Sequence, residues 1–270
     1  MSTQNKHKTH RFMHPDFVHL KTGESVVLPT EVSQHLRVLR LKIGDHLSLL
    51  DGMGGVAQVC LEQTTSKHNT VKVLEVQHTK KPAYRDVLVQ ALSGMDKMDW
   101  VIEKATELGI AEIYPVMTAR SQIRLDLNDD AQRVLKKQQH WQSIARSACE
   151  QSGNTWLPSI APVQTLTSVL QTLQTSATKT PQFIFDTQDH PSFIGSDTDL
   201  QCEKLESLER APSVHLAVGP EGGFNTEEIA QFTVLGWRTR SLGSLVLRTE
   251  TAPIVALSQL ALWRLLKNKI

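Results

Sequence analysis

The sequence has little cysteine and no long apolar run. Its three cysteines lie far apart, with no CxxC pair and no metal-site spacing, so neither a disulfide framework nor a zinc site is expected. No apolar stretch approaches the roughly 20 residues that a membrane-spanning helix needs. The opening segment MSTQNKHKTHRFMHP also lacks the apolar stretch of a secretory signal. We therefore expect a globular protein of the cytoplasm with reduced thiols and no bound metal.

The sequence also has no marked excess of positive or negative charge. The 29 Lys and Arg residues nearly balance the 28 Asp and Glu residues, and 40% of the chain is hydrophobic, which excludes charged tails and wholesale disorder. The balance hides an asymmetry, because residues 1–85 carry 12 basic and 7 acidic side chains together with 8 of the 11 histidines. Unless it arose by chance, this net charge of +5 on the front and −4 on the remainder favours a polyanion as the partner of the N-terminal part.

The pattern of predicted elements changes near residue 82. The first 80 residues read as a small β-barrel with one helix at Glu31–Leu41 and short strands joined by Gly turns, namely Ser25–Leu28, His46–Leu50, Val56–Glu62 and Thr70–Val76. Strands and helices then alternate, which predicts a mostly parallel α/β sheet. Its expected strands are Asp86–Leu92, Glu112–Met117, Gln182–Asp186, Val214–Val218 and Arg240–Leu242. Its expected helices are Asp96–Leu108, Asp130–Ser152, Thr165–Thr180, Thr226–Leu235 and Thr251–Leu266, with a loop at Gln188–Pro212.

The sharpest local motif is the segment Gly219–Phe224, which reads GPEGGF and follows a predicted strand. Glycines there let the backbone approach a ligand closely, and Asn225 with Glu228 predicts a capping box at the start of the next helix. The motif has neither the Lys-Ser/Thr of a phosphate loop nor the G-x-G-x-x-G spacing of a dinucleotide site. Since the carboxylate of Glu221 would repel a phosphate and tolerate a cationic centre, the choice lies between such a ligand and a purely structural turn.

A second motif, L-G-x-x-x-L-R-T-E-T-A, runs from Leu242 to Ala252 and again leads from a strand into a helix. Taken alone, Arg248 beside Glu250 reads as an ion pair at a helix start. GPEGGF followed about 20 residues later by this motif is a specific combination that indicates a family. The chain resembles the SPOUT class of S-adenosylmethionine-dependent RNA methyltransferases and, within it, the RsmE family. That resemblance is carried by Arg11-Phe12, His35–Arg40, Gly44-Asp45, Asp51-Gly52, Lys104–Gly109, Arg120-Ser121, Glu150–Ser152, Gly219–Phe224 and Leu242–Ala252.

The resemblance implies a fold, a reaction and a partner. Residues 1–82 would form a PUA-like β-barrel that binds RNA, and residues 83–270 an α/β SPOUT methyltransferase domain with a trefoil knot, paired as a homodimer. The enzyme would use S-adenosyl-L-methionine to methylate N3 of a uridine in 16S ribosomal RNA of the small subunit. Departures from the family pattern are Asn154 and Leu245 at positions that are often basic, Ala119 for Glu, and Met13 for Phe; Arg146 and Arg240 are basic residues that could substitute.

The resemblance also implies site residues. The cofactor would be held by Phe185, Asp186, Val218, Gly219, Glu221, Gly223, Leu242, Gly243 and Leu247. Arg248 is the first catalytic candidate, as a donor to a uracil oxygen that gains negative charge, and Glu250 would act as a base or would orient Arg248. Contacts to RNA would come from Arg11, Arg37, Arg40 and Arg120.

Other functions remain open at this point. A SPOUT methyltransferase acting on another base or on a ribose 2′-hydroxyl would keep the same loops, so only product analysis separates it. A non-catalytic RNA-binding module would fail to bind S-adenosylmethionine. A nucleotide-binding enzyme for small molecules is disfavoured by the absent phosphate motifs.

Overall fold

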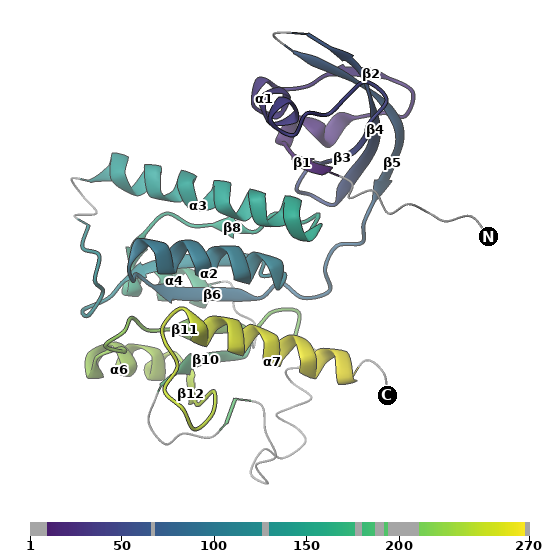
Figure 1. Ribbon diagram of the computed structural model, residues 1–270. Helices are drawn as coiled ribbons and strands as arrows, with labels where there is room; N and C mark the ends of the chain where they lie inside the picture. Colours follow the sequence, from purple (N-terminus) through teal and green to yellow (C-terminus); the bar gives the residue numbers. More distant parts are fainter. Residues whose placement is uncertain are drawn as a thin grey trace. The chain divides into compact units, whose positions relative to one another are not determined.

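The computed structural model describes residues 10–65, 68–125, 130–175, 180–186, 192–193 and 211–267 (Figure 1). The chain divides into two compact units. Unit 1 comprises Met1–Lys81 with Arg146–Leu157, and unit 2 comprises Pro82–Ala145 with Pro158–Ile270. Cys202 and most of the loop predicted at Gln188–Pro212 lie outside the described residues. Within the described parts, no helix is both long and apolar enough to cross a membrane.

Unit 1 is built on a five-stranded mixed sheet. The strand order is β1-β3-β4-β5-β2, in which β1 pairs with β3 in parallel and the other pairs are antiparallel. The strands are β1 (His10–Met13), β2 (Ser25–Val27), β3 (His46–Leu50), β4 (Gly55–Thr64) and β5 (Asn69–His78). A 3-10 helix, η1 (Pro15–His19), and α1 (Thr30–Val38) complete it.

The core of unit 1 follows from alternation along its strands. In β4 the side chains of Ala57, Val59 and Leu61 are buried, and the residues between them are more exposed. They pack with Leu36 of α1 and with Phe12 of β1 in one apolar cluster. The four strands predicted here are confirmed within two residues. Strand β1 was not predicted, because four residues reading HRFM carry too little periodicity to reveal a strand.

Unit 2 contains one sheet whose strand pairs are all parallel among the described residues. The order is β12-β10-β11-β6-β7-β8, with β9 also paired to β7. The strands are β6 (Val87–Ala91), β7 (Glu112–Met117), β8 (Ser159–Ile160), β9 (Gln164–Thr165), β10 (Gln182–Phe185), β11 (His215–Val218) and β12 (Arg238–Arg240). The central strand β6 is buried at every position, as expected of a parallel strand covered on both faces.

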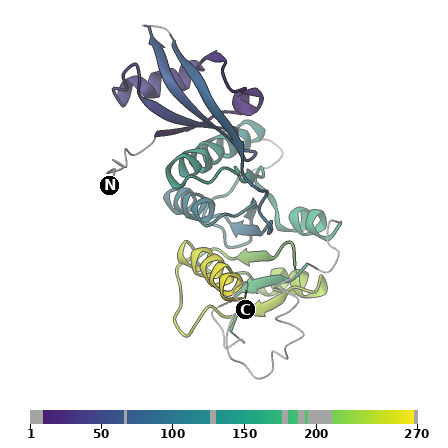
Figure 2. The same ribbon diagram turned by 90° about the vertical axis from the view of Figure 1, so that its right-hand side faces the viewer.

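Helices cover both faces of this sheet. They are α2 (Met95–Glu107), α3 (Ala131–Ser152), α4 (Leu166–Thr175), α6 (Thr226–Val234) and α7 (Thr251–Lys267). Figure 2 shows the sheet between α2 and α7 on one side and α4 and α6 on the other. The α4 and α6 side is closed by an apolar cluster that includes Val89, Ile184 and Phe232. Helix α3 runs through both units, since its residues from Arg146 onward belong to unit 1.

Two details of unit 2 differ from expectation. Strand β12 ends at Arg240, whereas the sequence predicted a strand at Arg240–Leu242. Ser241 forms only an isolated bridge with Ser192, and Gly243 has a φ of +136°, where the chain turns out of the sheet. Strands β8 and β9 are only two residues long and were not foreseen. The trefoil knot stays a prediction, because most of the chain between residues 187 and 210 lies outside the described part.

A buried ion pair ties the last helix to the first strand of unit 2. The guanidinium of Arg264 on α7 donates to both carboxylate oxygens of Asp86, with a distance of 3.0 Å from Nη2 to Oδ1. The same Asp86 oxygen accepts the backbone N–H of Val214 at 3.0 Å. Arg264 also stacks on the ring of Tyr84, 3.8 Å from its centroid. Because both charges are almost fully buried, each depends on the other for its hydrogen bonds.

Replacing Asp86 with Ala should lower the free energy of unfolding by about 3–5 kcal/mol, because it leaves the Arg264 charge buried without a partner. The matched control is Arg85→Ala, which removes the half-exposed ion pair of Arg85 with Glu112 and should cost less than about 1 kcal/mol. Urea unfolding followed by circular dichroism measures both. Equal losses in the two variants would contradict this account.

Candidate functional site

A cleft of about 710 Å³ opens in unit 2 at the carboxyl ends of β10, β11 and β12. Three segments form its walls: the end of β10 at Phe185-Asp186, the glycine loop (Gly219–Phe224) after β11, and the β12 loop (Ser241–Glu250). Ligands of open α/β sheets bind at this edge. All the residues predicted to hold a cofactor line the cleft, namely Phe185, Asp186, Val218, Gly219, Glu221, Gly223, Leu242, Gly243 and Leu247.

The glycine loop needs its glycines for two separate reasons. A Cβ on Gly219 would lie 3.0 Å from the backbone nitrogen of Phe224 and 3.2 Å from the carbonyl carbon of Gly223, so a side chain there would collide with the returning loop. Gly223 has a φ of +68°, which other residues rarely adopt. The loop thus folds back on itself, and its backbone faces the cleft without covering side chains.

The predicted capping box is present, and it does more than begin a helix. The side chain of Asn225 accepts the N–H of Glu228 at 2.8 Å, and Glu228 Oε2 accepts the N–H of Asn225 at 2.9 Å. The other carboxylate oxygen of Glu228 accepts the N–H of Ala119 at 2.6 Å. This buried carboxylate therefore joins the start of α6 to the loop after β7, a long-range contact that the motif alone does not reveal.

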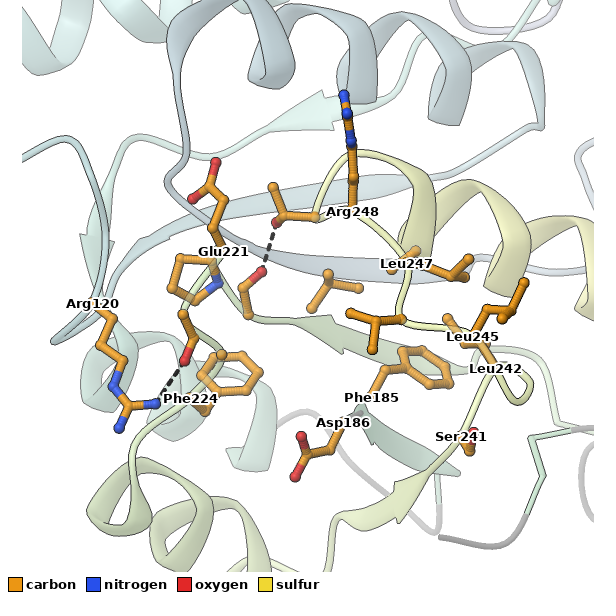
Figure 3. A pocket seen from close by; sticks show the side chains of 18 of the residues that line it. Arg120, Phe185, Asp186, Glu221, Phe224, Ser241, Leu242, Leu245, Leu247 and Arg248 are labelled. Carbon is orange, nitrogen blue, oxygen red and sulfur yellow. Dashed lines mark hydrogen bonds between the residues drawn. The ribbon is translucent and has the colours of Figure 1, made fainter. Parts of the chain in front are cut away.

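Arg120 supports the glycine loop from the same side. Its Nη1 donates to the carbonyl oxygen of Gly222 at 2.6 Å, as Figure 3 shows, and its aliphatic chain lies where a Cβ on Gly222 would stand. Arg120 was predicted to contact RNA. In this structure it lines the cleft and holds a backbone carbonyl, so at least one of its donors has a structural task.

Thr249 joins the β12 loop to the glycine loop. Its hydroxyl donates to the carbonyl oxygen of Gly219 at 2.7 Å (Figure 3) and accepts from Nε2 of Gln90 on β6 at 3.3 Å. Thr249 is only 5% exposed and Gln90 is fully buried, so neither bond competes with solvent. Neither residue was predicted as part of the site. The available signal was the position of Thr249 two residues before a helix, where a hydroxyl can cap backbone groups.

The path of the β12 loop explains why the cleft is enclosed. The chain leaves the sheet at β12, which is an end strand next to β10. It then passes the carboxyl ends of β10 and β11 and reaches Gln90 on β6, the third strand in from β12. Figure 3 shows the apolar side chains of Leu242, Leu245 and Leu247 on the same side of the cleft as Phe185. The loop thus supplies an apolar wall opposite the glycine loop.

Four charged side chains form a cluster at one end of the cleft: Lys97, Glu221, Arg248 and Glu250. Lys97 Nζ donates to Glu221 Oε1 at 2.6 Å and lies 3.8 Å from Glu250 Oε2. Arg248 Nη1 lies 4.0 Å from Glu250 Oε1, and its side chain is 84% exposed. Figure 3 shows Arg248 pointing away from the apolar wall. The predicted catalytic pair thus lies together, with Arg248 lining the cleft and Glu250 beside it.

Lys97 is the member of this cluster that the sequence analysis missed. It stands in the first turn of α2, where the helix dipole disfavours a cation, and a lysine at that position after a buried strand was the signal available. The hydrogen bond to Glu221 raises the pKa of Lys97 above its ordinary value, with smaller contributions from the charges of Glu221 and Glu250. Lys97 is therefore a protonated donor at neutral pH.

The predicted RNA contacts of unit 1 have different surroundings. Arg37 and Arg40 are exposed at the end of α1, and Arg40 has a φ of +56°. Arg11 is exposed too, but its Nη1 donates to the carbonyl oxygens of Gln151 and Glu150 at 3.3 and 3.5 Å. It thereby caps the C-terminus of α3, where a cation is favourable.

The motif Glu150–Ser152 also has a structural task in unit 1. Glu150 Oε1 accepts the backbone N–H of Met13 at 2.8 Å, which fixes β1 to the last turn of α3. Burial raises the pKa of the Glu150 carboxyl, and this hydrogen bond opposes the rise. Ser152 donates to the carbonyl of Ala148 at 2.7 Å. The motif therefore closes the contact between β1 and α3.

Chemically, the cleft suits a ligand with an apolar flat part and a polar or cationic end. Leucine side chains and Phe185 can enclose a ring, and backbone groups of the glycine loop can bond to the edge of that ring. The carboxylates of Asp186 and Glu221 can accept hydrogen bonds from hydroxyl or amino groups of the ligand. Among the described residues, no cluster of three His, Cys, Asp or Glu side chains could hold a metal ion. No phosphate-binding lysine motif is present in the glycine loop.

Comparison with known proteins assigns both parts of the chain. Residues 79–261 match an RNA methyltransferase domain, and residues 28–74 match an RNA methyltransferase PUA domain. The chain is 30% identical to the ribosomal RNA small subunit methyltransferase E of Bacillus subtilis, over 86% of this chain and 87% of that protein.

Solved structures agree with this assignment. A methyltransferase of Legionella pneumophila in complex with bound SAM is 32% identical and aligns with a TM-score of 0.79, covering 94% of this chain and 97% of that one. The ribosomal RNA small subunit methyltransferase E of Neisseria gonorrhoeae, bound to S-adenosyl methionine, is 27% identical with a TM-score of 0.78, covering 93% and 95%. From its domains, its relatives and its fold, the chain belongs to the RsmE family of RNA methyltransferases.

Proposed function

We propose that this protein transfers a methyl group from S-adenosyl-L-methionine to N3 of a uridine in the 16S ribosomal RNA of the small subunit. The observation that carries the proposal is the cleft itself, where the glycine loop and the β12 loop meet at the carboxyl edge of a parallel sheet and are joined by Thr249. The sequence relatives named for methylating small-subunit RNA, and the similar structures with S-adenosylmethionine bound, support the same reaction.

The residues of the cleft fit this cofactor. Gly219, Gly222 and Gly223 line the cleft without side chains, so backbone groups of the glycine loop can bond to an adenine edge. Phe185, Leu242 and Leu247 would enclose the adenine ring, and Asp186 would accept hydrogen bonds from the ribose hydroxyls. Glu221 also lines the cleft, but its charge is offset by Lys97, so it would border the cofactor without adding a net charge. Val218, Gly223 and Gly243 would complete the binding surface.

The protein has two tasks in the reaction: it must place the base and favour its anion. When bound, S-adenosylmethionine supplies a methyl group on a cationic sulfur, so that N3 gains the methyl group while the carbon–sulfur bond breaks and its electron pair stays on sulfur. Uridine N3 is protonated at neutral pH and is then a poor nucleophile. Arg248 would donate to a uracil oxygen and stabilise the negative charge that develops when N3 loses its proton.

Glu250 would orient Arg248 for this contact. Its Oε1 faces Arg248 at 4.0 Å, and its side chain is far less exposed than that of Arg248, at 17% against 84%. A largely buried carboxylate beside an exposed guanidinium restricts where the guanidinium can go. Because N3 lies on the Watson–Crick edge, the target base must be unpaired or turned out of its helix before it reaches this position.

The N-terminal and C-terminal parts of the chain would have separate functions. We propose residues 1–82 as the RNA-binding domain and residues 83–270 as the methyltransferase domain. Arg37 and Arg40 are exposed and suit contacts with RNA phosphates, and the remaining donors of Arg11 and Arg120 would add to them. The net charge of +5 in residues 1–85 supports this division.

We also propose that the protein acts as a homodimer in the cytoplasm, where small ribosomal subunits are found. Helix α7 supports the first part, since Leu262, Leu265 and Leu266 are each more than half exposed there. An apolar face of this kind is suited to a second copy of the chain.

Incubation with labelled S-adenosylmethionine and undermethylated small subunits should yield 3-methyluridine after nuclease digestion. Mass spectrometry of the nucleosides identifies the product. A 2′-O-methylated nucleoside or another methylated base would replace the proposed target with a different one. Absence of any product, together with no binding of the cofactor by calorimetry, would leave an RNA-binding module.

Replacing Arg248 with Ala should lower the turnover number about 100-fold or more and change the affinity for S-adenosylmethionine little, because the side chain points away from the apolar wall. Single-turnover rates and calorimetric titration separate the two effects. If turnover is unchanged while cofactor binding collapses, Arg248 belongs to the cofactor site.

A further inference from the structure

Three cationic side chains line the cleft within the described part of the chain: Lys97, Arg120 and Arg248. They differ in their exposure and in the hydrogen bonds that they already make. Arg120 donates to the Gly222 carbonyl and supports the glycine loop. Arg248 is 84% exposed, and its carboxylate partner is 4.0 Å away. Lys97 is about one-third exposed, at 34%, and is fixed by a short hydrogen bond.

The position of Lys97 has no rationale in the stability of its helix. It stands in the first turn of α2, where acidic residues are favoured and a cation is disfavoured. Its Nζ carries three protons, and one of them is donated in the hydrogen bond to Glu221 at 2.6 Å. Glu250 Oε2 lies at 3.8 Å, beyond hydrogen-bond distance. The ammonium is thus held at the end of the cleft with donors left for a ligand.

We propose that Lys97 is a further catalytic residue, whose ammonium group donates to a carbonyl oxygen of the target uracil and stabilises the anion that forms when N3 loses its proton. This inference rests on the proposed function, since it concerns the same base in the same cleft. It assigns to Glu221 the positioning of Lys97, because that carboxylate fixes the ammonium from the glycine loop.

The chemistry of the step is that of an acid dissociation followed by alkylation. The N3–H bond breaks, its electron pair stays in the uracil ring, and the proton passes to solvent water. The negative charge spreads onto the two ring carbonyl oxygens, where a cation stabilises it. Lys97 keeps its own protons throughout, because the carboxylates of Glu221 and Glu250 lie beside it and favour its charged form.

The surroundings of Lys97 favour this role over that of a base. The charged groups facing it are the carboxylates of Glu221 and Glu250, which favour its protonated form, and Arg248, which opposes it weakly. Two carboxylates against two cations leave the cluster near neutrality. A uracil anion in place of neutral uracil would therefore meet two donors, one anchored at Lys97 and one exposed at Arg248.

The test compares Lys97→Met, Lys97→Arg and a matched control, Lys104→Met. Lys104 lies on the same helix two turns later, is held by Glu103 and Glu107 at 2.7 and 2.8 Å, and does not line the cleft. Single-turnover formation of 3-methyluridine on undermethylated small subunits is followed from about pH 6 to pH 9.5 with saturating cofactor. Calorimetry gives the affinity of each variant for S-adenosylmethionine, and thermal melting reports its folding.

We expect Lys97→Met to lose about 100-fold in rate at pH 7 and to recover as the pH rises, because hydroxide can then form the anion without the lysine. The rise of rate with pH should shift upward by about two pH units, the equivalent of a 100-fold change. Lys97→Arg keeps the charge and should keep most of the wild-type profile. Lys104→Met should follow the wild type, and cofactor affinity should stay within about threefold in all variants.

Four results would overturn the proposal. An equal loss of rate for Lys97→Met at every pH would mean that the lysine only supports the cleft. A loss of cofactor affinity would assign Lys97 to cofactor binding, and an unchanged rate would remove it from the reaction. If the wild-type protein forms a methylated nucleoside other than 3-methyluridine, the proposed function fails and this inference fails with it.

Discussion

The buried hydroxyl of Thr249 is the contact on which the cleft depends. By donating to the Gly219 carbonyl and accepting from Gln90, it holds the β12 loop over the carboxyl ends of β10 and β11. Both partners are excluded from solvent, so a broken bond would leave buried polar atoms unpaired, at a cost of about 1–3 kcal/mol. One side chain therefore joins the two loops that enclose the cleft.

Other side chains in this region follow the same physical rule. Loops beyond the ends of strands have lost their sheet hydrogen bonds, and their backbone groups need other partners. Glu228 bonds to Ala119, and Arg120 bonds to Gly222. The sequence predicts Glu228 in a capping box and Arg120 in contact with RNA, but each also bonds to the backbone of a neighbouring loop. The cations that remain for chemistry are Arg248, which is exposed, and Lys97, which one carboxylate holds in place.

How much the sequence predicts depends on how local the signal is. Strands such as β6 and helices such as α2 follow from periodicity, and the Asn225 capping box follows from a spacing of three residues. Strands β1, β8 and β9 are too short to show a period. The structural roles of Arg11, Arg120 and Glu228 come from contacts between distant parts of the chain. The family resemblance supplied the cofactor residues that line the cleft, but it did not reveal Lys97.

The most direct test of this account is the affinity of Thr249→Val for S-adenosylmethionine. Valine keeps the shape of the side chain and removes both hydrogen bonds. The control is Thr106→Val, which alters a buried hydroxyl of α2 that donates to Ile102 within its own helix. We predict that Thr249→Val binds the cofactor about tenfold more weakly or worse by calorimetry, and that Thr106→Val binds it like the wild type. Wild-type affinity in Thr249→Val would contradict the claim that this contact builds the cofactor site.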